Sequence, residues 1–206
     1  MALEFRRVCK TFGFGDAAVT AVDTIDFSVN AGEFVAVVGP SGCGKSTLLS
    51  MTAGLYAPTS GAVMVSGQAV TGPNAHVGFM LQKDLLLPWR SIRANVEFGL
   101  EARGIPKAAR RDRAMAELDR CQLCGFEGKY PYQLSGGMRQ RAALARTLAI
   151  DPEIILLDEP FSALDAQTKL LLQDSFATTI AEAKKTTLLI THDLTEAVLM
   201  ADRVLV

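Results

Sequence analysis

The feature that most constrains this chain is a glycine-rich loop, Gly39-Pro40-Ser41-Gly42-Cys43-Gly44-Lys45-Ser46-Thr47. It fits the pattern G-x-x-x-x-G-K-[ST] and follows Val35 to Val38, an apolar run typical of a strand buried on both faces. A helix is predicted directly after it, from Leu48 to Ala53. Glycines let the backbone curl so that its N–H groups point at phosphate oxygens, and the helix N-terminus adds partial positive charge. The complete pattern in this setting predicts a phosphate-binding loop rather than a simple strand-to-helix connection.

Two side chains of this loop carry specific expectations. Lys45 supplies a full positive charge for the β- and γ-phosphates of a nucleoside triphosphate, and we expect ATP. Ser46 offers a hydroxyl oxygen to Mg²⁺, an ion that prefers oxygen ligands and completes its octahedral shell with phosphates and water.

Acidic residues follow a second apolar run. Ile154 to Leu157 ends in Asp158 and Glu159. Ligands of open α/β sheets bind at the carboxyl ends of the strands, so both acids are expected beside the phosphate loop. Because successive residues of a strand point opposite ways, we expect the acids to differ in task. Asp158 would help to hold Mg²⁺, and Glu159 would orient and polarise the attacking water.

A third apolar run, Thr187 to Ile190, ends in Thr191-His192-Asp193. By the same argument His192 is expected at this edge, where its imidazole would contact the γ-phosphate and hold Glu159 in register. Taken alone, a histidine at a strand end is more often a solvated loop residue.

The order of these segments predicts an α/β fold with a parallel sheet. Short β-type runs alternate with turns in the first third, and strand signals nearly vanish between about 88 and 147. Leu172, Phe176 and Ile180 mark one apolar helix face between the last two strands. We expect a single domain, with a nucleotide-binding core and β subdomain at 1–87 and 146–206 and an inserted helical subdomain at 88–145. Because the chain stops inside the apolar run that starts at Arg203, we expect its C-terminus to be truncated.

The bulk composition excludes several classes of protein. Lysine and arginine total 21 against 22 acidic residues, so the chain lacks the charge excess that binding a nucleic-acid backbone requires. No apolar run approaches the roughly 18 residues of a membrane span, and no apolar segment follows the charges at the N-terminus. The sequence therefore predicts a cytoplasmic protein without a nucleic-acid partner.

The four cysteines suit a reducing compartment. Only Cys121 and Cys124 are close in sequence, and His76 and His192 lie in segments that suggest no metal site. We interpret the pair as two small apolar residues one helical turn apart rather than as a metal or redox motif.

One further segment identifies the family. Leu134-Ser135-Gly136-Gly137-Met138-Arg139-Gln140-Arg141 resembles the signature motif of the ATP-binding cassette (ABC) ATPases. Gln82 is similar to the glutamine of their Q-loop, Ser162-Ala163-Leu164-Asp165 to their D-loop, and His192 to their switch histidine. These motifs occur in the family's order over nearly the whole chain, and the resemblance implies a RecA-like P-loop core with an N-terminal antiparallel β subdomain.

The resemblance implies an ATP site shared between two copies of the chain. Ser135, Gly136 and Gly137 of one copy would close over the ATP held by Lys45 of the other, with hydrolysis releasing the two. It also implies that Gln82 acts in catalysis and at Mg²⁺, that Asp165 belongs to the nucleotide site, and that Phe12 stacks on adenine. Phe12 as an ordinary packing residue is the alternative.

The segment from Leu85 to Ile92, together with Tyr130-Pro131 and Ala163 to Thr168, resembles the nitrate, sulfonate and taurine importers. In such importers the residues after the Q-loop meet the membrane permease, and a solute-binding protein delivers the solute. The resemblance thus implies a peripheral subunit on the cytoplasmic face of the membrane that drives solute uptake. Trp89 lies in this segment, and it could equally be a core residue.

Two other functions are consistent with the resemblance. A soluble ABC ATPase without a permease is disfavoured by the compact spacing from Gln82 to Ser135 and by the balanced charge. A regulatory module that binds nucleotide without hydrolysing it is disfavoured because Lys45, Glu159 and His192 are all present.

Overall fold

The computed structural model describes residues 1–206, apart from the side chain of Asp16. It divides into two compact units. The first comprises Met1–Phe79, Glu153–Asp158 and Lys184–Val206, and the second comprises Met80–Pro152 and Glu159–Ala183. The helical segment expected at 88–145 falls within the second unit.

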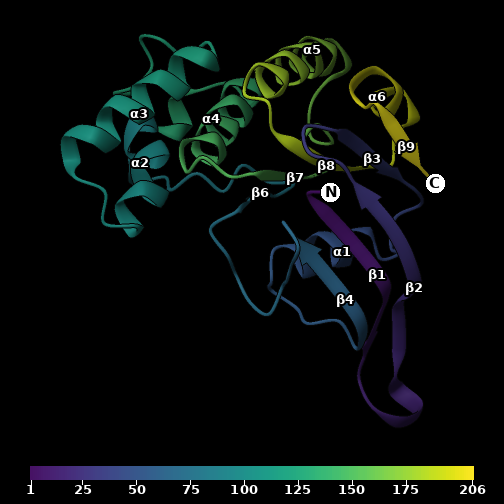
Figure 1. Cartoon of the computed structure of the whole chain (residues 1–206). Coiled ribbons are helices and arrows are strands. Elements are labelled where there is room, and N and C mark those ends of the chain that lie inside the picture. Colours follow the sequence, from purple (N-terminus) through teal and green to yellow (C-terminus); the bar gives the residue numbers. More distant parts are fainter. The chain divides into compact units, whose positions relative to one another are not determined.

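The elements of the chain alternate between strands and helices as follows (Figure 1). They are β1 (Leu3–Phe12), a 3-10 turn (Gly15–Ala17), β2 (Val19–Val29), β3 (Phe34–Val38), α1 (Lys45–Thr52), β4 (Ser60–Val65), β5 (Gln68–Ala69), β6 (Val77–Met80), α2 (Ile92–Ala102), α3 (Lys107–Arg120), a 3-10 turn (Pro131–Gln133), α4 (Gly136–Ala149), β7 (Ile154–Asp158), α5 (Ala166–Glu182), β8 (Thr186–Thr191), α6 (Leu194–Met200) and β9 (Arg203–Leu205).

The predicted parallel sheet is confirmed. Its five strands lie in the order β6-β7-β8-β3-β9, and β3 pairs in parallel with both β8 and β9. Strand β7 pairs in parallel with β8, with Asp158 opposite Ile190. Central strands of a parallel sheet are covered on both faces, which explains why β3, β7 and β8 are almost uninterrupted apolar runs.

A second sheet is antiparallel, with the order β2-β1-β4-β5. Strand β1 pairs with β2 and with β4, each with irregular register at its middle. Its inward-facing side chains Leu3, Phe5 and Val8 join α1 and the parallel strands in one apolar core of the first unit. Phe5 stacks on Phe27 at a centroid distance of 4.4 Å.

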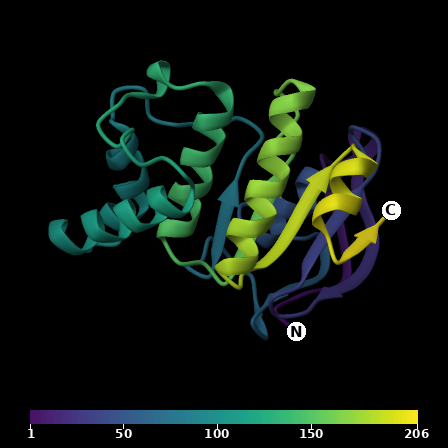
Figure 2. The same ribbon diagram turned by 90° about the horizontal axis from the view of Figure 1, so that it is seen from above.

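The second unit is helical between 88 and 147, as the sequence predicts. Helices α4 and α5 lie side by side (Figures 1 and 2), and their contact depends on Gly137. A Cβ atom on Gly137 would approach Thr168 Cγ2 to 3.0 Å and Leu172 Cδ1 to 3.1 Å. The predicted buried face of α5, Leu172, Phe176 and Ile180, is confirmed, and each of these side chains is at most 2% exposed.

Three expectations of detail are wrong. Helix α4 begins at Gly136 rather than at Met138, because the hydroxyl of Ser135 accepts a hydrogen bond from the N–H of Met138 and caps the helix. Cys121 and Cys124 do not lie on one helix, since α3 ends at Arg120. Trp89 is not a core residue, because it is 72% exposed.

Candidate nucleotide site

The phosphate loop is shaped by glycine at the point where α1 begins. Gly44 caps this helix with φ of +98°, and a Cβ atom there would lie 2.0 Å from the carbonyl oxygen of Ala21. No other residue type fits that backbone and that space. The loop thus leads from β3 directly into the N-terminus of α1, as a phosphate-binding loop requires.

Lys45 is held inside the loop. Its side chain is only 6% exposed, and its ammonium donates hydrogen bonds of 2.8 Å to the carbonyl oxygens of Gly39 and Pro40. The Sγ atom of Cys43 lies 3.8 Å from the same nitrogen. The loop therefore carries a fixed positive charge among backbone groups, which suits a phosphate ligand.

Ser46 and Asp158 come together from distant parts of the sequence. The hydroxyl of Ser46 donates a hydrogen bond of 3.1 Å to Oδ1 of Asp158, the last residue of β7. A hydroxyl and a carboxylate are oxygen donors of the kind Mg²⁺ prefers, so this pair fits the ion. Among the described residues no three His, Cys, Asp or Glu side chains form a metal-binding group, so the remaining ligands would come from phosphate and water.

Glu159 differs from Asp158 for a reason that the sequence analysis did not foresee. The expectation was that the two acids alternate along one strand, and this is wrong. Strand β7 ends at Asp158, and Glu159 adopts a left-handed backbone with φ of +43°. Such strain in a residue with a side chain costs about 1–3 kcal/mol and persists where the surroundings impose it. The backbone turn, rather than strand alternation, directs the side chain of Glu159.

Gln82 lies near this turn within the second unit. Its amide nitrogen donates a hydrogen bond of 3.1 Å to the hydroxyl of Ser162, and that hydroxyl donates one of 3.0 Å to the carbonyl oxygen of Glu159. The sequence analysis gave Ser162 no role of its own.

The segment after Gln82 is gripped by side chains of α4. Arg139 donates a hydrogen bond of 3.1 Å to Oδ2 of Asp84, and Arg146 donates to the carbonyl oxygens of Asp84 and Leu85 at 2.6 and 2.7 Å. Burial lowers the pKa of Arg146, and the nearby charge of Asp84 opposes that shift. Sequence reasoning missed these contacts. The signal was the spacing of Arg139 and Arg146, two turns apart on one face of α4.

The remaining predicted residues occupy the ends of elements. Ser135 caps α4, and Asp165 caps α5 by accepting a hydrogen bond of 3.0 Å from the N–H of Thr168. That bond and the hydroxyl of Thr168 lower the pKa of Asp165. His192 is exposed and directly follows β8, as predicted.

Phe12 ends β1 with its ring 38% exposed. It meets Tyr56 edge to face at 5.5 Å, and the ammonium of Lys10 lies 5.0 Å from its centroid. The ring is thus partly accessible within an aromatic pair, which is compatible with stacking on a base.

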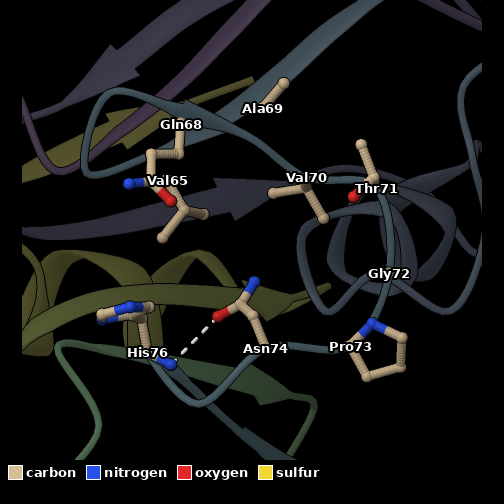
Figure 3. A pocket seen from close by; sticks show the side chains of 9 residues that line it. All are labelled: Val65, Gln68, Ala69, Val70, Thr71, Gly72, Pro73, Asn74 and His76. Carbon is tan, nitrogen blue, oxygen red and sulfur yellow. Dashed lines mark hydrogen bonds between the residues drawn. The ribbon is translucent and has the colours of Figure 1, made fainter.

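The pocket in Figure 3 is not this site. It has a volume of about 220 Å³ and is lined by residues of the loop from Val65 to His76, none of which the sequence analysis assigned to nucleotide. Asn74 bends toward His76 and accepts a hydrogen bond of 3.0 Å from its backbone N–H. His76 pairs instead with Glu153, at 2.7 Å.

Comparisons with known proteins place the chain in a family. Residues 22–162 match the sequence profile of the ABC transporter family. An uncharacterized ABC transporter ATP-binding protein of Methanocaldococcus jannaschii is 50% identical over 204 residues, 99% of this chain and 76% of that protein. The nitrate import ATP-binding protein NrtD of a Synechocystis strain is 46% identical over 206 residues, 100% of this chain and 77% of that protein.

A taurine import ATP-binding protein, TauB of Yersinia pestis, is also 46% identical, over 90% of this chain and 72% of that protein. Among solved structures, a dimeric ATP-binding cassette in a post-hydrolysis state with ADP and phosphate superposes with a TM-score of 0.84 at 32% identity, covering 98% of this chain and 92% of that one. The chain therefore belongs to the ABC transporter family, as an ATP-binding subunit that hydrolyses ATP, and it resembles the taurine and nitrate importers of that family.

Proposed function

We propose that this chain is the ATPase of an ABC importer and that two copies close on ATP to drive solute uptake. The observation that carries the proposal is the presence, in one chain, of both parts of a composite triphosphate site. One part is the loop with Lys45 and Ser46 beside Asp158, and the other is the capped N-terminus of α4 at Ser135 to Gly137. Both units of the chain act as one ABC domain.

In this proposal ATP binds with its phosphates in the loop from Gly39 to Thr47. Lys45 stabilises the β- and γ-phosphates, and Ser46 and Asp158 hold Mg²⁺, with Gln82 as a further oxygen ligand. When bound, Mg²⁺ offsets charge on the phosphates. Phe12 stacks on adenine.

The hydrolytic step rests on Glu159 and His192. Glu159 orients a water molecule and accepts its proton as the water attacks the γ-phosphate. His192 contacts the γ-phosphate from the end of β8. From the second copy, Ser135, Gly136 and Gly137 bind the γ-phosphate through a hydroxyl and backbone N–H groups, and Asp165 lies in the same interface.

The permease is proposed to bind the segment that follows Gln82. Exposed apolar side chains gather there: Leu81, Leu85 and Trp89. Large exposed apolar groups close together mark interaction sites. Among the described residues no helix has the length and apolar character needed to cross a bilayer. We place the chain on the cytoplasmic face of the membrane, against permease subunits that a solute-binding protein supplies from the other side. The relatives named for taurine and nitrate import support this solute class.

The variant Glu159→Gln tests the enzymatic part. It keeps the size and polarity of the side chain and removes the base, so we expect ATP binding to persist, turnover to fall at least a hundredfold, and an ATP-bound dimer to accumulate. Gel filtration with ATP and a phosphate-release assay measure both. Unimpaired hydrolysis would exclude Glu159 as the base.

Trp89→Ala tests the permease contact. We expect the variant to keep its ATPase activity in solution and to lose co-purification with permease subunits from detergent-solubilised membranes. Phe14→Ala is the matched control, since Phe14 is also an exposed aromatic but lies outside this segment. Equal recovery of permease with both variants would contradict the proposed contact.

A further inference from the structure

Ser162 closes the turn that carries Glu159. Its backbone N–H donates a hydrogen bond of 3.2 Å to the carbonyl oxygen of Glu159, and its hydroxyl donates a second one of 3.0 Å to the same oxygen. Two donors on one carbonyl fix the plane of the peptide that leaves Glu159. The φ angle of Glu159 is +43°, a strained value that needs such support.

Packing anchors the other side of this turn. Phe161 is fully buried and meets Phe176 of α5 edge to face at a centroid distance of 5.1 Å. Pro160, which precedes it, is also buried. The turn is therefore held by an apolar contact at Phe161 and by polar contacts at Ser162, and only the polar contacts involve a group that can change partners without disturbing the core.

The hydroxyl of Ser162 also has a definite orientation. A serine hydroxyl has one proton and two acceptor lone pairs. Because its proton is directed at the Glu159 carbonyl, a lone pair accepts the amide hydrogen of Gln82, at 3.1 Å. Hydrogen bonds in series polarise and strengthen one another. A change at Gln82 thus alters the bond that the hydroxyl makes to Glu159.

We propose that Ser162 is a positioning residue for ATP hydrolysis, through which the side chain of Gln82 controls the orientation of Glu159. This inference rests on the proposed roles of Glu159 and Gln82, and it deepens them by naming the link between them. When Gln82 donates to Ser162, the turn is held and Glu159 is aimed for proton transfer. When the amide of Gln82 moves away, the hydroxyl is no longer oriented and the turn loosens. Hydrolysis then follows the position of the segment after Gln82.

The test is a set of variants of the full chain: Ser162→Ala, Ser162→Thr, Gln82→Ala and the double variant Ser162→Ala with Gln82→Ala. The measurements are kcat for ATP hydrolysis, Kd for ATP in the presence of EDTA, and Tm. We expect Ser162→Ala to lower kcat about tenfold, the equivalent of one hydrogen bond of ordinary strength, with Kd within twofold of the parent. Ser162→Thr keeps the hydroxyl and should retain most of kcat. Ser175→Ala, on α5, is the matched control and should change nothing.

The double variant decides the question. If Ser162 acts on Glu159 under the control of Gln82, removing both side chains lowers kcat no further than the more damaging single change. Losses that multiply, or a Ser162→Ala variant whose kcat equals that of the parent, overturn the inference. So does failure of Ser162→Thr to restore kcat while Tm is unchanged. Parent-level turnover in Glu159→Gln would instead remove the proposed role of Glu159 itself, whereas an inactive Glu159→Gln with multiplying losses sinks this inference alone.

Discussion

The hydroxyl of Ser46 donates a hydrogen bond to the carboxylate of Asp158, a residue 112 positions further along the chain. One group stands at the start of α1 and the other at the end of β7. The strands β3, β8 and β7 are neighbours in parallel, so their carboxyl ends lie along one edge of the sheet. This geometry brings the hydroxyl and the carboxylate together as two oxygen donors for one cation.

Replacing Asp158 by Asn should weaken Mg²⁺ binding specifically. The amide keeps an acceptor for Ser46 but removes the negative charge, and we expect the Mg²⁺ concentration at half-maximal ATPase activity to rise about tenfold, the equivalent of ~1.4 kcal/mol. A titration of activity with Mg²⁺ at saturating ATP measures this. Asp174→Asn, on the exposed face of α5, is the control. An unchanged half-saturation point would exclude a role for the Asp158 charge at the ion.

The fold and much of the site could be predicted because their signals are local. The phosphate loop is one continuous segment, and the strands before Asp158 and His192 are unbroken apolar runs. For parallel strands, the carboxyl ends alone place such residues at one edge. The position of β3 between β8 and β9 was not predictable in the same way, since these strands pair across more than 140 residues.

The contacts that support the site could not be predicted. The left-handed backbone of Glu159 has no signal in Asp158-Glu159-Pro160, because an acid at a strand end usually continues in an extended or helical conformation. The grip of Arg139 and Arg146 on the segment after Gln82 joins residues more than 50 positions apart. A sequence pattern shows that such arginines share a helix face, but not which backbone carbonyls they meet.

The contact between Asp84 and Arg139 should contribute to the stability of the second unit. Arg139 also donates a hydrogen bond of 2.8 Å to the carbonyl of Leu134, just before the signature loop. We expect Arg139→Gln to lower the free energy of unfolding by about 1–2 kcal/mol, because the bonds involve a charged group that is partly shielded from solvent. In urea unfolding, Asp84→Asn combined with Arg139→Gln should show a coupling energy of about 0.5–1 kcal/mol.

Arg120→Gln is the control for this experiment. Arg120 pairs with Glu117 on the surface of α3, at 2.9 Å, and pairs of this kind contribute about 0–1 kcal/mol. Additive effects of the two changes at Asp84 and Arg139, within about 0.3–0.5 kcal/mol, would show that the ion pair itself stabilises nothing.

The aromatic pair at the end of β1 should affect nucleotide affinity rather than turnover. If Phe12 stacks on adenine, Phe12→Ala removes a contact made equally in the ground and transition states, so KM for ATP should rise about fivefold, the equivalent of ~1 kcal/mol, with kcat unchanged. Phe12→Trp keeps a flat ring and should retain affinity. Steady-state kinetics with ATP, and with Phe14→Ala as control, measure this. A fall in kcat without a change in KM would contradict stacking.

The thiols should differ sharply in reactivity. Burial, assisted by the negative charge of Glu117, raises the pKa of Cys121 to about 12. At pH 8 only about one thiolate in ten thousand forms at that pKa, and the side chain is 1% exposed, so a thiol reagent should not label Cys121 in the folded protein. Cys124 is exposed, but its Sγ donates a hydrogen bond of 2.9 Å to the carboxylate of Asp119, which raises its pKa. Cys43, exposed in the phosphate loop, should react faster than Cys124.

The same shift predicts how stability changes in alkali. The pKa of Cys121 is higher in the folded chain than its ordinary value of 9.0, so the protonated thiol stabilises the fold fully below about pH 9, and this contribution is lost as the pH rises toward 12. Cys121→Ala should therefore flatten the fall in Tm above pH 9. Mass spectrometry of reagent-treated protein gives the labelling order, and ATP should protect Cys43 alone. Labelling of Cys121 as fast as Cys43 in the folded chain would show that its thiol is neither buried nor held protonated.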